Sequence, residues 1–151
     1  MKSLYLDASI PSACCEKSEA ERRKITLQWW KKEINHYRIV VSQLTVEEIK
    51  ALKTEKKRED ILSLISKFPI LEITSLAERL ANRYIQEKIF PQNSYNDALH
   101  LSLAVTNRID IFLSWDRAHI VKKEVERKIN AFNLISGYPR ITIMSPDKFT
   151  R

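Results

Sequence analysis

Glycine and cysteine are scarce in this chain, and their scarcity excludes several kinds of site. Gly137 is the single glycine among 151 residues, so a Gly-rich phosphate-binding loop of the P-loop or dinucleotide-binding type is excluded. The two cysteines, Cys14 and Cys15, are adjacent. A disulfide between neighbours is strained, and two thiols are too few for a zinc site. We therefore expect two unpaired thiols in a reducing cytosol.

Long apolar runs are also missing. The longest stretches, LHLSLAV, IFLSW and YRIVV, are far shorter than the ~20 residues that a membrane-spanning helix needs. The N-terminus reaches Asp7 without the charged-then-apolar pattern of a secretion leader. We expect a cytoplasmic protein with no membrane segment.

The composition that remains is that of a globular protein with a basic surface. Hydrophobic residues make up 44% of the 151 residues, which fits one domain spanning residues 1–151. The formal net charge is +7. Such a surplus attracts polyanions and bears on partners rather than on fold. Nucleic acid is one such partner, and plain solubility is the alternative explanation.

Short apolar strands alternate with amphipathic helices along the chain. The expected strands cover residues 2–6, 38–41, 70–73, 111–113 and 141–144. The expected helices cover residues 25–37, 46–52, 61–68, 76–88, 96–106 and 119–134, the last of them capped by Gly137. Residues 53–60 (KTEKKRED) are either a mobile loop or the start of the next helix. The alternation predicts an α/β fold, a central mostly parallel sheet of four to five strands with helices on both faces.

Four acidic residues stand where one expected element gives way to the next. Asp7 and Asp116 follow strands, whereas Glu48 and Asp97 open helices. Functional groups gather at the carboxyl ends of parallel strands. Two carboxylates ~4 Å apart repel each other by roughly 4 kcal/mol at an effective dielectric of 20, and a cation would offset that repulsion. Oxygen ligands without cysteine favour Mg²⁺ or Mn²⁺.

Helix capping is the competing explanation for these acids. The capping-box spacing, a hydroxyl residue three positions before an acid, occurs at Thr45 and Glu48, at Ser94 and Asp97, and at Ser75 and Glu78. Taken alone, Asp7 also fits a turn residue after a strand, and Asp116 fits the cap of the helix that follows. Only a shared metal explains why all four acids should meet.

Four segments in order, LYLDAS, SQLTVEEI, NDALHLSLAV and DIFLSWDRAHI, resemble the PIN-domain ribonucleases, especially VapC-type toxins of toxin–antitoxin pairs. The resemblance implies a three-layer PIN-like fold. It implies that Asp7, Asp97 and Asp116 bind the metal and that Glu48 is the fourth catalytic acid, orienting the attacking water. Glu47 competes for that last role, but the family's acid is followed directly by an apolar residue, as Glu48 is by Ile49.

Three polar residues accompany the acids in the resembling segments. Ser9 and Ser114 stand where family members carry a small polar residue beside the metal, although turn hydroxyls explain them equally well. His100 follows Asp97 by one helical turn, so it can face the same crevice. Relatives often have Asn where this chain has Asp116. Asp110, just before the strand, is interpreted as a solvated loop acid.

The implied activity is that of a Mg²⁺- or Mn²⁺-dependent endoribonuclease, the toxin of a type II toxin–antitoxin system. Its implied partners are RNA, an antitoxin protein and a second copy of the chain in a homodimer. One alternative is a PIN-like RNA-binding or interaction module that does not cut. A phosphatase with Asp7 as nucleophile is disfavoured, because such sites usually carry a second acid where this chain has Ser9.

Overall fold

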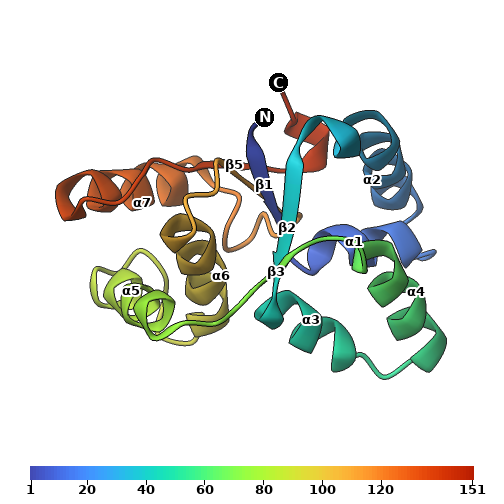
Figure 1. The fold of residues 1–151 in the computed structure, drawn as a ribbon, viewed down its shortest axis with the longest axis horizontal. Helices are drawn as coiled ribbons and strands as arrows, with labels where there is room; N and C mark the ends of the chain where they lie inside the picture. The colour runs from blue at the N-terminus through green and yellow to red at the C-terminus, as the bar shows by residue number, and fades with distance from the viewer.

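The computed structural model describes residues 1–151 and shows a parallel sheet between two layers of helices (Figure 1). The strands are β1 (Ser3–Leu6), β2 (Arg38–Ser42), β3 (Ile70–Leu71), β4 (Ile111–Leu113) and β5 (Thr142–Met144). Their order is β3-β2-β1-β4-β5, and every pairing is parallel. The α/β fold expected from the sequence is confirmed, with five strands.

Helices cover both faces of the sheet (Figure 1). One layer contains α1 (Ser9–Cys15), α2 (Ala20–Glu33) and α4 (Glu55–Ile65), and the other contains α5 (Ser75–Gln86), α6 (Tyr95–Thr106) and α7 (Lys123–Ser136). Helix α3 (Gln43–Lys50) follows β2 and contacts both α4 and α6. Two short 3-10 turns, η1 (Ile34–His36) and η2 (Pro146–Lys148), complete the chain. No helix is long and apolar enough to cross a membrane.

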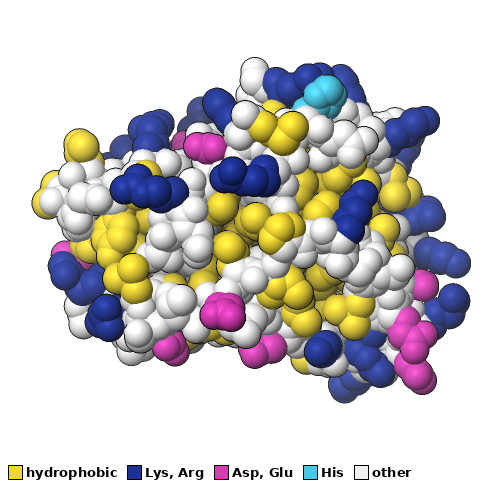
Figure 2. All heavy atoms as spheres, in the orientation of Figure 1, with side chains coloured by type: hydrophobic (Ala, Val, Ile, Leu, Met, Phe, Trp, Pro, Cys, Tyr) yellow, Lys and Arg dark blue, Asp and Glu magenta, His cyan; other side chains and the backbone are white.

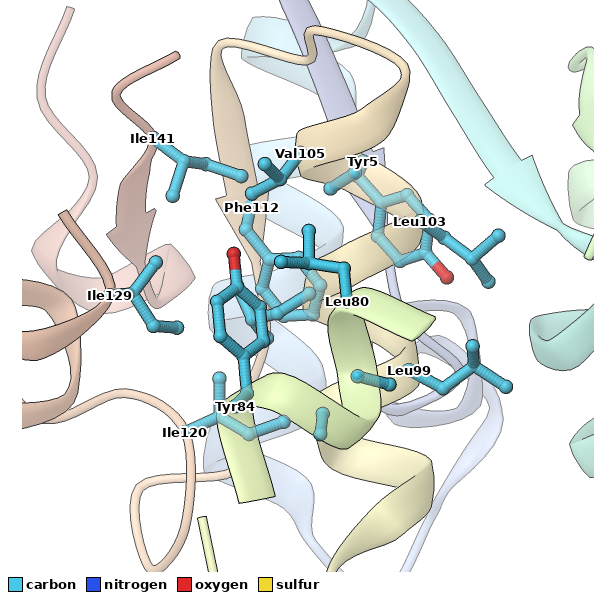
Figure 3. Packing of buried hydrophobic residues seen from close by; sticks show 14 of the residues in the cluster. Tyr5, Leu80, Tyr84, Leu99, Leu103, Val105, Phe112, Ile120, Ile129 and Ile141 are labelled. Carbon is cyan, nitrogen blue, oxygen red and sulfur yellow. The ribbon is translucent and has the colours of Figure 1, made fainter. Parts of the chain in front are cut away.

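Alternating side chains along β1 divide the core between the two layers. Leu4 and Leu6 are buried with the α1, α2 and α4 layer, whereas Tyr5 between them is buried with the α5, α6 and α7 layer. This is the two-residue period of a strand covered on both faces. Tyr5 pairs with Phe112 of β4, and their rings stack with centroids 5.0 Å apart. Figure 3 shows both rings among the apolar side chains of the second layer.

Several element boundaries differ from the sequence-based expectation. Helix α1 was not among the expected helices, and α2 begins at Ala20 rather than at residue 25. Residues 55–60 form the start of α4, so the mobile-loop interpretation of that segment is wrong. Helix α7 begins at Lys123 rather than at residue 119, because residues 116–121 first form a hydrogen-bonded turn.

Three helices are followed by a residue with left-handed backbone geometry, and only one of these residues is a glycine. Gly137 caps α7 with φ 81°, as expected. Lys88 after α5 and Arg108 after α6 adopt φ 59° and 57° without being glycine. After each of them the chain donates a backbone hydrogen bond five residues back, from Ile89 to Tyr84 and from Ile109 to Ala104, which is the Schellman pattern.

The capping-box interpretation is wrong at all three helices. Helix α3 is capped by Ser42, which accepts a hydrogen bond from the Thr45 N–H, so Glu48 lies well inside the helix. Helix α5 is capped by Thr74, which accepts from the Ala77 N–H. Ser94 precedes α6 without any side-chain capping bond. Capping therefore leaves Glu48 and Asp97 unexplained.

The strand order has its switch point between β1 and β4. From β1 the chain crosses to β2 and β3 on one side, and it later returns to β4 and β5 on the other. Ligand sites of open parallel sheets form at such a switch point, outside the carboxyl ends of the strands. Asp7 directly follows β1, and Ser114 and Asp116 follow β4. The fold thus brings these three residues to one edge.

Candidate active site

Asp7 joins the two strand ends at the switch point. It is 5% exposed, and its Oδ1 accepts hydrogen bonds from the Ser9 N–H, at 3.0 Å, and from the Ser9 hydroxyl. Its Oδ2 accepts the Ser114 hydroxyl. Ser114 Oγ in turn accepts the Asp116 N–H at 3.0 Å. Both serines therefore orient the carboxylate, and Asp7 is also the turn residue that its position after a strand suggested.

The hydrogen bonds of Asp7 leave room for a ligand. Each carboxylate oxygen offers about two lone pairs, so the two donors on Oδ1 occupy that atom fully. Only one donor reaches Oδ2, which keeps a lone pair available. Burial raises the pKa of Asp7, although the hydrogen bonds from Ser114 and Ser9 act in the opposite direction. A cation at Oδ2 would favour the ionised carboxylate that burial disfavours.

Asp97 is a half-buried acid at the start of α6 that receives no hydrogen bond from the protein. Its helix runs antiparallel to β4, so the first turn lies at the carboxyl edge of the sheet. Burial raises the pKa of Asp97 most, and the negative charges of Asp116 and Asp7 raise it further. Asp97 is thus held among acids without a compensating donor.

Asp116 and His119 complete a cluster with Asp97. One ligand atom from each of the three residues lies within 4.8 Å of the others. Asp116 Oδ1 accepts the His119 N–H at 2.9 Å, and His119 Nδ1 lies 3.3 Å from the carboxylate. Asp116 therefore caps a turn rather than α7, and it faces Asp97 as well. The sequence analysis assigned no role to His119; its three-residue spacing from Asp116 was the available signal.

Glu48 enters the site from α3 through His100. Its Oε1 lies 2.7 Å from His100 Nε2, and no second contact engages Oε2. Burial raises the pKa of Tyr5 most, and the negative charges of Asp7 and Glu48 both raise it further. Glu47 is exposed and contacts none of these residues. Of the two adjacent acids, Glu48 is the one that the fold brings to the site.

His100 continues into a buried hydroxyl network that the sequence analysis missed. Its ring is 3% exposed, and Nδ1 lies 2.6 Å from the Tyr5 hydroxyl. That hydroxyl lies 2.7 Å from Ser42 Oγ. Tyr5 sits inside an apolar strand and Ser42 at a strand end, so their residue types gave no sign of a shared site. His100 follows Asp97 by one helical turn, and its ring contacts the Glu48 carboxylate.

The donor set suits a hard divalent cation. The cluster that could hold an ion combines the carboxylates of Asp97 and Asp116 with the His119 imidazole, and carboxylate oxygens are ligands that Mg²⁺ and Mn²⁺ prefer. Burial raises the pKa values of Asp7 and Asp97, and a bound cation would lower them. Over the whole chain, 26 Lys and Arg residues exceed 19 Asp and Glu residues, and basic side chains are spread over the visible face in Figure 2. An acidic centre thus lies within a basic protein.

Comparison with known families now decides the identity of the fold. The family model of the PIN domain matches residues 4–125, a segment that contains all four acids. The chain belongs to the PIN domain family. A search among functionally curated proteins finds no match to this PIN protein.

Solved structures with the same fold include toxins and toxin–antitoxin complexes. The sarcin-ricin loop cleaving toxin VapC20 of Mycobacterium tuberculosis has a TM-score of 0.64 and 15% identity, covering 77% of this chain and 92% of its own. FitAcB of Neisseria gonorrhoeae has a TM-score of 0.62 and 14% identity, covering 97% and 99%. A toxin–antitoxin complex of Klebsiella pneumoniae has a TM-score of 0.58 and 16% identity, covering 82% and 94%. At these identities the likeness establishes a shared PIN fold.

Proposed function

We propose that this PIN protein is a metal-dependent endoribonuclease that hydrolyses RNA phosphodiester bonds. The observation that carries the proposal is the cluster of Asp97, Asp116 and His119 at the carboxyl edge of the sheet, where Asp97 has no protein donor and burial raises its pKa. Helix capping does not account for Asp97, nor for Glu48 on α3. A protein tolerates such a cluster when a bound cation, as in nucleases, offsets the repulsion.

The proposed mechanism assigns a different role to each residue of the site. Asp7, Asp97 and Asp116 would hold Mg²⁺ or Mn²⁺. When bound, the ion would lower the pKa of a water and neutralise charge on the phosphate. Glu48, with Oε2 free of protein contacts, is placed to orient the attacking water and accept its proton. Ser9 and Ser114 fix the plane of the Asp7 carboxylate by hydrogen bonds.

The surroundings of the site support the wider biological proposal. The net charge of +7 favours binding of the RNA backbone. We propose that the protein is a cytoplasmic toxin of a type II toxin–antitoxin system, that residues 1–151 act as a single PIN-like domain, and that two copies form a homodimer. Toxin–antitoxin complexes among the structural neighbours support an antitoxin partner.

RNA cleavage with and without metal tests the proposal. Wild-type protein with Mg²⁺ or Mn²⁺ should cut structured and single-stranded RNA, and EDTA should stop the reaction. Asp7→Asn should lower the cleavage rate by more than about 100-fold, since it alters a proposed ligand rather than a group behind one. Asp60→Asn, an exposed change on α4 away from the site, should cut like wild type.

The same assay separates the nuclease from the non-cutting module. A module that binds phosphates without metal should retain RNA affinity in EDTA and in Asp7→Asn, and it should leave the RNA intact. Cleavage that persists equally in EDTA or in Asp7→Asn would reject the metal-dependent mechanism. Intact RNA after incubation with metal-loaded wild type would favour the binding module.

A further inference from the structure

Two buried hydroxyl groups stand behind His100, on the side of the ring away from Glu48. The Tyr5 hydroxyl lies 2.6 Å from His100 Nδ1 and 2.7 Å from Ser42 Oγ. Both Tyr5 and Ser42 are 0% exposed. The three residues come from β1, β2 and α6, and Glu48 adds α3. One continuous set of short contacts therefore links four elements of the fold to a carboxylate of the site.

The number of protons that each group can donate determines which group is the donor in each of these hydrogen bonds. Burial raises the pKa of Tyr5, so the phenol keeps its one proton and can donate it once. Ser42 Oγ accepts the Thr45 N–H at 3.2 Å and has one proton to donate. The Thr45 hydroxyl donates its own proton to the Leu6 carbonyl at 3.2 Å. The question is where the Ser42 proton goes.

The distances favour donation from Ser42 to Tyr5. Tyr5 is 2.7 Å from Ser42 Oγ, the usual O–H···O length, whereas Thr45 Oγ1 is 3.4 Å away. With Ser42 donating to Tyr5, the phenolic proton is directed at His100 Nδ1. A neutral imidazole that accepts at Nδ1 carries its proton on Nε2. That Nε2–H then donates to Glu48 Oε1 at 2.7 Å.

We propose that Tyr5 and Ser42 are positioning residues: the Tyr5 hydroxyl, oriented by Ser42, donates to His100 Nδ1 and so holds the Nε2–H ring in the orientation that fixes the Glu48 carboxylate. The role of Glu48 toward water rests on the proposed function, but the tautomer of His100 does not. With Oε1 engaged by His100, Oε2 is the oxygen left to face the attacking water. Hydrogen-bonded partners behind a functional group commonly orient it in this way.

The Tyr5 ring allows its hydroxyl to be removed cleanly. It stacks on Phe112 with an interplanar angle of 12° and lies among buried apolar side chains, as Figure 3 shows. Tyr5→Phe therefore deletes the hydrogen bonds while the packed ring stays. Tyr84 provides a matched control, because it is equally buried and its hydroxyl donates to Asn133 at 2.8 Å, outside the site.

The experiment combines NMR of the histidine ring nitrogens in metal-free protein with RNA cleavage kinetics in Mg²⁺. Wild type should show His100 with its proton on Nε2. Tyr5→Phe should leave His100 Nδ1 without its donor and so shift the Nδ1 resonance, and kcat should fall by about 10–100-fold, the usual effect of altering a group behind a functional residue, while KM for RNA stays within about twofold. Tyr84→Phe should lower thermal stability to a similar extent, with the wild-type histidine spectrum and kcat.

Each outcome decides the proposal. A wild-type spectrum with a proton on His100 Nδ1, either alone or together with one on Nε2, overturns it, whether or not the protein cleaves RNA. A Tyr5→Phe variant with an unchanged histidine spectrum and unchanged kcat overturns it as well. Equal losses of kcat in Tyr5→Phe and Tyr84→Phe assign the effect to stability and also reject a positioning role. If wild type leaves RNA intact but shows the expected tautomer, the proposed function fails and the tautomer assignment stands.

Discussion

Acidic side chains at the two ends of strands β1 and β4 differ in the hydrogen bonds that they receive from the protein. At the amino end, Asp110 Oδ2 accepts the Ser3 N–H at 2.9 Å and the Ser3 hydroxyl at 3.1 Å, and Ser3 Oγ accepts the Asp110 N–H at 3.0 Å. At the carboxyl end, Asp97 receives no donor, and burial followed by the negative charge of Asp116 raises its pKa. Asp110 pins two strands together, so it is more than the solvated loop acid expected from the sequence.

Asp110 stabilises the fold through its hydrogen bonds, whereas the acids at the carboxyl edge add charge that the protein compensates less completely. Asp110 Oδ2 accepts both hydrogen bonds from Ser3, and the side chain is otherwise exposed to solvent. The carboxyl-edge cluster keeps lone pairs free on Asp7 and Asp97. Such under-compensated charge is expected where an external cation completes the structure. Three changes test the contrast between the two ends.

Metal binding should give the largest effect. Because a ligand that binds only folded protein stabilises it by mass action, Mn²⁺ at about 100 times its Kd adds about 2.7 kcal/mol, or about 5–10 °C in Tm for a protein of this size. Asp97→Asn should abolish most of this shift, and Asp110→Ala should retain it. Thermal unfolding with and without Mn²⁺ measures the difference. An equal shift in all three proteins would place the ion elsewhere.

Breaking the amino-end contact should give the next largest effect. Asp110→Ala removes both acceptor contacts and leaves the buried Ser3 N–H without a partner, which costs about 2 kcal/mol. Chemical denaturation should show this loss of unfolding free energy. RNA cleavage measured well below Tm should stay at the wild-type rate. A fall in the cleavage rate without a fall in stability would connect the two ends functionally.

Neutralising the carboxyl-end cluster should give a smaller effect of opposite sign. Without metal, Asp97→Asn relieves repulsion from Asp116 and Asp7; solvent screening limits the gain to about 1 kcal/mol, or about 2–4 °C in Tm. The variant should nevertheless lose cleavage activity. Asp60→Asn is the control and should leave Tm unchanged within error. A Tm below that of wild type in EDTA would contradict the repulsion.

The difference in stability between wild type and Asp97→Asn should depend on pH. Because the folded-state pKa of Asp97 is raised above its unfolded value, folded protein binds more protons than unfolded protein between the two values. Wild-type stability should therefore fall as pH rises through that window, from the ordinary Asp range up to the raised pKa. Asp97→Asn should lack this component, so the two proteins should converge in stability at pH values below the window.

Much of the site was predictable because its acids mark the ends of regular elements. The strand before Asp7 and the strand before Asp116 are short apolar runs, and topology alone brings their ends together. Which of the adjacent acids Glu47 and Glu48 points inward was harder to predict, because the exposure of each depends on where α3 begins. That start is set by Ser42, one turn earlier than the expected cap.

The parts that sequence reasoning missed depend on contacts between distant segments. Tyr5 looks like an ordinary strand residue, and only the fold brings its hydroxyl to His100, 95 positions away. Helix α1 was overlooked because its short apolar segment contains Ser9, Pro11 and Ser12, residue types that favour turns. Local preference thus describes strands and long helices better than short connecting ones.

The left-handed residues after α5 and α6 have a consequence for how this chain folds. Lys88 and Arg108 occupy a backbone region that costs a residue with a side chain about 1–2 kcal/mol relative to glycine. A glycine at either position would relax that cost but would add freedom to the unfolded chain, worth about 0.5–1 kcal/mol. The buried Ile89 and Ile109 that follow anchor both turns. With a single glycine in its sequence, the protein accepts local strain at two helix ends and keeps its unfolded ensemble comparatively stiff.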